Sequence, residues 1–164
     1  MDVLLRLEQA GFFTWVRESS SLWAYPTILF LHTIGLATLV GVNAGIDLRI
    51  LGFAPELPLA PMTRLFPIIW AAFGINAVSG TILLIADATT KVTNPVFFVK
   101  MVFIALALVN LRLLRTRVFG DPLVDKQPLS TSARILAITS LIFWVGATTA
   151  GRLMAYIGPV SGLQ

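Results

Sequence analysis

Long apolar runs separated by short polar segments dominate the pattern of hydrophobic and polar positions along this chain. Four runs, at about residues 22–46, 64–86, 95–116 and 132–157, reach the roughly 20 residues that a helix needs to cross a bilayer. Asn94 followed by Pro95 is a typical helix start, and Gly158-Pro159 is a typical stop. The sequence therefore predicts an all-α fold: a membrane four-helix bundle in one domain, residues 1–164.

The segment before the first run, residues 2–19, is too short and too charged to span a membrane. At helical spacing its apolar residues share one broad face, and its charged residues lie elsewhere. We expect this segment to form an amphipathic helix that lies in the membrane interface. The alternative is a loosely ordered terminus.

Composition supports a membrane location. Hydrophobic residues make up 57% of the chain and charged residues 12%, against about a quarter charged in a typical soluble domain. The mean hydropathy is +0.87. A soluble fold of this size could not bury so much apolar surface, so lipid is expected to cover the rest. The absence of cysteine excludes disulfides, iron–sulfur clusters and thiolate zinc sites.

Basic residues predict the orientation, because cytoplasmic loops carry an excess of Lys and Arg. With four spans, the first and third loops share one side of the membrane. That side holds seven of the basic residues: Arg49, Arg64, Arg112, Arg115, Arg117, Lys126 and Arg134. The other side holds five: Arg6, Arg17, Lys91, Lys100 and Arg152. We expect these two loops in the cytoplasm and both termini outside. The basic residues are then explained by membrane topology and do not indicate nucleic-acid binding.

Polar residues inside the spans are costly, so each one is a candidate for function. At about 100° per residue, His32, Asn43 and Asp47 fall within roughly 60° of one another and form one stripe. Asn76 and Asp87 repeat that spacing in the second span. Two interpretations remain open. Either the asparagines bridge helices by hydrogen bonds, or the stripe lines a path for a transported solute; its members are Asn43, Asp47, Asn76 and Asp87.

Small residues follow the opposite face of the first span, with Ala37, Gly41 and Gly45 at a spacing of four. Such a row allows another helix to approach closely. The partner is either another helix of this bundle or a second copy of the chain.

The depth of three residues suggests a binding site. His32 lies nine residues after Trp23, or about 13 Å along the helix, while Lys100 and Arg152 lie about 7–8 Å from the same surface. Two cations at that depth need anionic partners. The partners are either carboxylates of the chain, namely Asp87 with Lys100 and Glu18 or Asp87 with Arg152, or the carboxylates of a ligand.

Haem b is the ligand that fits these residue types. His32 would be the iron ligand, the metal-binding residue, and Lys100 and Arg152 would hold the propionates. Because the chain has a single histidine, the opposite axial position would be empty or filled by Met101, Met154 or His32 of a second copy.

Several stretches resemble a family of small bacterial inner-membrane proteins of this length, for which no activity is established. They include ESSSLWAYPTILFLHTIGLATLVG (18–41), FGINAVSGTILLIADA (73–88), NPVFFVKMVFIALALVNL (94–111) and GRLMAYIG (151–158). The element PVFFVK also resembles the membrane domain of copper-resistance protein D and its b-type cytochrome relatives, which have several membrane histidines. The resemblance implies a bacterial inner-membrane location.

Three functions are therefore considered. The first is a redox or ligand-binding membrane component that holds haem b, or another anionic cofactor, near His32, Lys100 and Arg152. The second is a non-catalytic subunit or scaffold, as a homodimer or with a partner membrane subunit. The third is a small oligomeric transporter. The sequence leaves open whether the protein is an enzyme.

Overall fold

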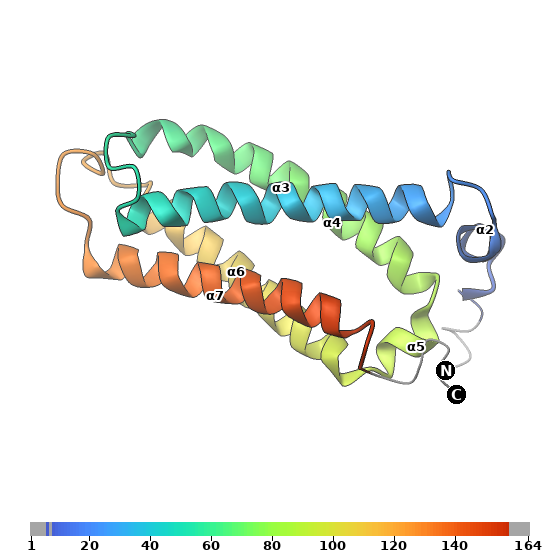
Figure 1. The fold of residues 1–164 in the computed structure, drawn as a ribbon. Coiled ribbons are helices and arrows are strands. Elements are labelled where there is room, and N and C mark those ends of the chain that lie inside the picture. Colours follow the sequence, from blue (N-terminus) through green and yellow to red (C-terminus); the bar gives the residue numbers. More distant parts are fainter. Residues whose placement is uncertain (1–5, 7, 158–164) are drawn as a thin grey trace.

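The computed structural model describes residues 6 and 8–157, and this part of the chain is helical without strands. Four long helices form the bundle: α3 (Tyr25–Leu51), α4 (Phe66–Ile85), α6 (Pro95–Arg117) and α7 (Thr131–Leu153) (Figure 1). Three shorter helical segments accompany them: α2 (Gly11–Glu18), the 3-10 helix η1 (Ala60–Leu65) and α5 (Ala88–Val92). The predicted all-α four-helix bundle is confirmed. We call its two ends the α5 end and the η1 end.

The four long segments, counting η1 with α4, are long and apolar enough to cross a membrane, with mean hydropathies of 1.6, 2.0, 2.1 and 1.5. Large apolar side chains cover their outward faces: Phe30, Val78 and Val145 are each more than 60% exposed. A protein in water would not leave so many such side chains uncovered on every helix. The chain is therefore a multi-pass membrane protein.

Side-chain caps mark the starts of α6 and α7, and the sequence predicts the one at Asn94. The Asn94 side chain accepts a hydrogen bond of 2.9 Å from the backbone N–H of Val96, and Ser130 accepts one of 3.2 Å from Ala133. The last helix differs from the prediction, because it ends at Leu153 and continues in turns to residue 156. The expected link over residues 87–94 contains the short helix α5.

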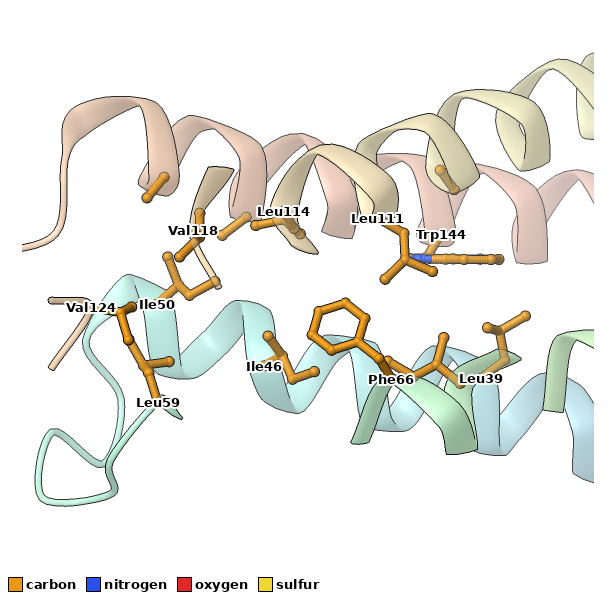
Figure 2. Packing of buried hydrophobic residues seen from close by; sticks show 14 of the residues in the cluster. Leu39, Ile46, Ile50, Leu59, Phe66, Leu111, Leu114, Val118, Val124 and Trp144 are labelled. Atoms are coloured by element: carbon orange, nitrogen blue, oxygen red, sulfur yellow. The ribbon is translucent and has the colours of Figure 1, made fainter. Parts of the chain in front are cut away.

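The bundle consists of two hairpins. Helices α3 and α4 pack along each other, as do α6 and α7, and the hairpins meet chiefly through α3 and α7. One apolar cluster fills the η1 half (Figure 2). Its largest members are Leu39, Ile46, Ile50, Leu59, Phe66, Ile69, Leu111, Leu114 and Trp144. Helices α4 and α6 are not among the pairs with extensive contacts, which leaves room between the hairpins in the α5 half.

The row of small residues on α3 does not pack within the bundle. Ala37, Gly41 and Gly45 are exposed, and a methyl group added at either glycine would meet no atom within 4 Å. The within-bundle explanation of this row is therefore wrong. The close approach between α3 and α4 occurs at Gly35, where an added methyl group would lie 3.2 Å from the carbonyl oxygen of Ala72.

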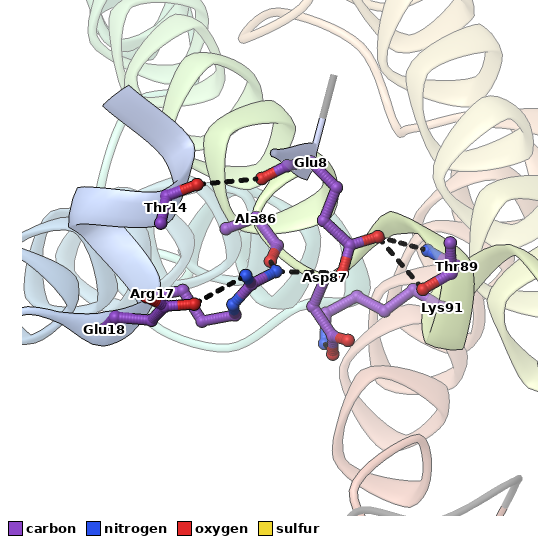
Figure 3. A network of polar contacts seen from close by, with 8 residues as sticks. All are labelled: Glu8, Thr14, Arg17, Glu18, Ala86, Asp87, Thr89 and Lys91. Carbon is purple, nitrogen blue, oxygen red and sulfur yellow. Dashed lines mark hydrogen bonds and ion pairs between the residues drawn. The ribbon is translucent and has the colours of Figure 1, made fainter. Parts of the chain in front are cut away.

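The amphipathic N-terminal segment is helical from Gly11 to Glu18, so the alternative of a loosely ordered terminus is wrong there; residues 2–5 and 7 of the predicted helix lie outside the described residues. Val16 is buried, while Phe12 and Trp15 are exposed. Figure 3 shows the polar contacts that hold this segment against the α5 end. Arg17 pairs with Glu8 at 2.9 Å, and Glu8 also accepts a hydrogen bond of 3.0 Å from the hydroxyl of Thr89.

At the η1 end, the loop before α7 is held to the loop before η1 by one carboxylate. Asp125 accepts hydrogen bonds from the backbone N–H groups of Leu59 at 2.6 Å and Ala60 at 2.9 Å. Because these bonds stabilise the ionised form, the Ala60 and Leu59 amides lower the pKa of Asp125.

Candidate functional site

His32 is held by reciprocal hydrogen bonds between α3 and α4. Its Nδ1 lies 3.1 Å from the carbonyl oxygen of Asn76 and 3.1 Å from Oγ of Ser79. In return, the side-chain amide of Asn76 donates to the carbonyl oxygen of His32 at 2.8 Å. Because a carbonyl oxygen only accepts, Nδ1 carries a proton, and Nε2 of the neutral ring is then an acceptor.

Gly80 makes room for the imidazole. A methyl group at this position would lie 2.9 Å from Cε1 of His32 and 3.3 Å from its Nδ1, which is too close for the ring to stay in place. The bond from Nδ1 to a backbone carbonyl is also the arrangement that orients metal-ligating histidines in proteins. No hydrogen bond among the described residues uses Nε2 of His32.

A cavity of about 460 Å³ lies beside His32 in the α5 half of the bundle. Its volume is within the range of roughly 300–1,000 Å³ that is typical of small-molecule sites. Leu39 and Trp144 belong both to this cavity and to the apolar cluster, so they form its inner end. All four long helices contribute: His32, Thr33, Leu36 and Leu39 from α3; Phe73, Asn76, Ala77, Gly80, Thr81 and Leu84 from α4; Phe97, Lys100, Met101 and Ile104 from α6; and Trp144, Ala147, Thr148, Gly151 and Arg152 from α7.

The structure thus brings His32, Lys100 and Arg152 to one cavity. Lys100 is half-buried and extends along α7, since a methyl group on Gly151 would lie 3.6 Å from its Nζ. Arg152 is exposed. Within the described range, neither cation has a carboxylate within salt-bridge distance.

The carboxylates proposed as protein partners are engaged elsewhere. Asp87 pairs with Lys91 at 2.9 Å, and Glu18 pairs with Arg17 at 2.9 Å. The predicted alternative, ion pairs from Asp87 to Lys100 and from Glu18 or Asp87 to Arg152, is therefore not formed. The cavity is consequently apolar over most of its wall and positively charged toward the α5 end.

The four residues of the polar stripe lie in three separate places. Asn43 and Asp47 are buried together among the apolar cluster, where the side-chain amide of Asn43 donates hydrogen bonds to Asp47 and to Ser140. Asn76 bridges α4 to the backbone of His32, which agrees with the interpretation that the asparagines join helices by hydrogen bonds. Asp87 lies at the α5 end in its pair with Lys91.

Sequence reasoning missed two residues of this region, Ser140 and Trp144. Both lie on the inward face of α7, and both are buried. Their spacing of four, in register with Ala133, Ala137 and Ala147, marks the inward face, but nothing in the sequence indicates what they face.

The residues present suit a cofactor better than a bare metal ion. The described residues contain no group of three or more His, Asp or Glu side chains that could hold a metal. Haem b would need one strong protein ligand for its iron, and His32 lines a mainly apolar cavity that also has two cations for the propionates. Met101 also lines the cavity, whereas Met154 does not.

No protein-family model, curated protein or solved structure matched this chain.

Proposed function

We propose that this protein is a ligand-binding component of a bacterial inner membrane, and that its cavity holds an anionic, mainly apolar cofactor beside His32. The observation that carries the proposal is a pair of cations, Lys100 and Arg152, on an apolar cavity in which they have no carboxylate partner among the described residues. Cations in such a place gain most from an anion that enters with the ligand.

Haem b is the specific candidate. His32 Nε2 would ligate the iron, and the Nδ1 bond to Asn76 would hold the ring in the orientation and tautomer that ligation needs. Lys100 and Arg152 would pair with the propionates. When bound, haem would supply one-electron redox chemistry, and the protein's own contribution would be to orient the group and exclude water from it.

The test is a visible absorption spectrum of protein purified from cells supplied with haem. We expect a Soret band from the wild type and none from His32→Ala, because no other described side chain lining the cavity is a comparable iron ligand. Lys100→Gln and Arg152→Gln should weaken haem retention without removing the band. Lys91→Gln and Arg134→Gln are matched controls, since these residues lie outside the cavity.

Gly80→Ala probes the same site without removing a ligand. The added methyl group would displace the imidazole by steric contact at 2.9 Å, so the band should shift or weaken while the protein stays folded. A folded, colourless wild type that takes up no haem would refute the haem proposal.

The proposed orientation places the α5 end outside and the η1 end in the cytoplasm. Support comes from the arginine-rich segment at the η1 end, where Arg112, Arg115 and Arg117 are all exposed. The cofactor would then lie in the outer half of the membrane.

A second candidate function is that of a membrane subunit, as a homodimer or with another protein. The exposed row of Ala37, Gly41 and Gly45 favours it, because nothing within the described bundle covers these residues. Cross-linking of single-cysteine variants at Ala37 and Gly41 in membranes would test it, and monomeric protein with no cross-link would argue against it.

A further inference from the structure

Asp47 is an unusual residue for the interior of an apolar bundle. Its exposed fraction is 0%, and it is the one charged side chain that is buried in the described part of the chain. Its neighbours in sequence, Ile46 and Ile50, belong to the apolar cluster of the η1 half. The cavity beside His32 does not include Asp47, so the proposed cofactor does not account for it.

The contacts of Asp47 leave one carboxylate oxygen without a partner. The side-chain amide nitrogen of Asn43 donates to Asp47 Oδ2 at 2.7 Å and to Ser140 Oγ at 2.7 Å. This uses both N–H groups of the amide. Asp47 Oδ1 is buried and accepts no hydrogen bond.

No cation of the described residues neutralises this carboxylate. Helix α4 contains no charged residue. Basic residues of the other long helices in this half of the bundle point elsewhere. Arg49 donates to the carbonyl oxygens of Leu57 and Pro55, and Arg115 lies over the ring of Phe66. The others, Arg112, Arg117 and Arg134, are exposed, and none of the salt bridges includes Asp47.

An ionised carboxylate in this place would be strongly unfavourable, because an unpaired charge in an apolar interior loses its hydration without compensation. A single positive charge removes that cost. A metal cation needs a shell of several oxygen ligands, and hard cations such as Ca²⁺ and Mg²⁺ take about six or more. Around Asp47 the side chains bonded in this cluster supply only the carboxylate, one amide and one hydroxyl, whereas a proton needs a single free oxygen.

We propose that Asp47 is a proton-binding site, in which Asp47 Oδ1 takes up the proton and Asn43 and Ser140 are positioning residues. Ser140 lies one helical turn from Trp144, which forms the inner end of the cavity. The proton site is therefore about 6 Å along α7 from the cavity wall. The proposal requires no ligand in the cavity and does not depend on the proposed function.

Infrared spectroscopy of the full chain in liposomes tests the proposal at neutral pH. We expect one C=O stretching band of a protonated carboxyl group in the wild type, with a downshift in D₂O. Asp47→Asn should remove the band, and Asp121→Asn, a change at an exposed loop carboxylate, should leave it. Asn43→Ala keeps the carboxyl group and removes its hydrogen bond, so it should shift the band to higher frequency.

Three results would overturn the proposal. One is a wild type without the band, and another is a band that persists in Asp47→Asn. The third is a band that appears only when sodium is removed, which would make the site one for Na⁺. If Asp47→Asn fails to fold, the Asn43→Ala shift decides the matter, and an unshifted band in that variant would contradict the arrangement described here.

Discussion

The close approach of α3 to α4 predicts different effects for substitutions at two glycines of α3. Gly35→Ala should destabilise the bundle relative to Gly41→Ala. At Gly35 the new methyl group would lie 3.2 Å from Ala72 O, 3.2 Å from Asn76 N and 3.3 Å from Ile75 Cγ2. At Gly41 it would meet nothing within 4 Å.

The difference in the free energy of unfolding between the two variants follows from the steric difference alone. Both substitutions replace glycine by alanine inside α3, so the gain in helix propensity, about 1 kcal/mol, is common to both and cancels in the comparison. Backbone atoms of α4 cannot move aside like a flexible side chain, so the added carbon forces the helices apart. Overpacking of this kind costs about 1–3 kcal/mol, and we expect the free energies of unfolding of the two variants to differ by about that amount.

Reversible unfolding in mixed micelles, followed by the loss of helical circular dichroism as the denaturing detergent is increased, would measure this difference. The wild type and Gly45→Ala, another change on the open face, are the controls. Equal stabilities for the Gly35 and Gly41 variants would refute the close approach at Gly35. A loss of stability in the Gly41 variant alone would instead indicate that the row of small residues is a packing surface.

Other predictions concern single contacts and the orientation. Asn76→Ala should lower the free energy of unfolding by about 0.6–2 kcal/mol, measured in the same micelles, because it removes the hydrogen bond to the carbonyl of His32 in an apolar environment. Asp125 has a lowered pKa, so its contribution to stability is present above its unfolded-state pKa and is lost as the pH falls through the folded one. The protection factors of the two amides that it binds, which are measured by hydrogen exchange relative to the intrinsic rate at each pH, should therefore fall as the pH is lowered, and Asp125→Asn should abolish this pH dependence. In a chain without cysteine, a cysteine introduced at Thr93 should be labelled from outside intact cells, and one at Gln127 only after lysis. The reverse labelling pattern would show that the protein has the opposite orientation in the membrane.

Features with a local chemical cause could be predicted from the sequence. Asn94 and Ser130 cap their helices through side-chain bonds two and three residues away, and such signals are readable in a short window. Helix α5 is harder to predict, because its five residues are too few to show the periodicity of a helix. Asp87 at its start also makes no capping bond.

Contacts between distant segments were harder to predict. Gly35 and Gly41 look alike in the sequence, and only the position of α4 makes one crowded and the other open. The Asn43–Ser140 bond joins residues 97 apart, so no local pattern could pair them. The depth of a residue along a helix can be counted from the sequence, so the sequence places His32, Lys100 and Arg152 together. The ion pair between Asp87 and Lys91, by contrast, depends on the geometry of α5.

If His32 ligates the proposed cofactor through Nε2, that nitrogen must carry no proton, and the single histidine of the chain makes this directly measurable. In protein labelled with ¹⁵N-histidine, nuclear magnetic resonance would report one imidazole. We predict that Nδ1 carries the proton and that Nε2 is unprotonated, with the Nε2 signal shifted or broadened beyond detection when ferric haem is added. A proton on Nε2 with an unprotonated Nδ1, or signals that haem leaves unchanged, would contradict ligation by His32.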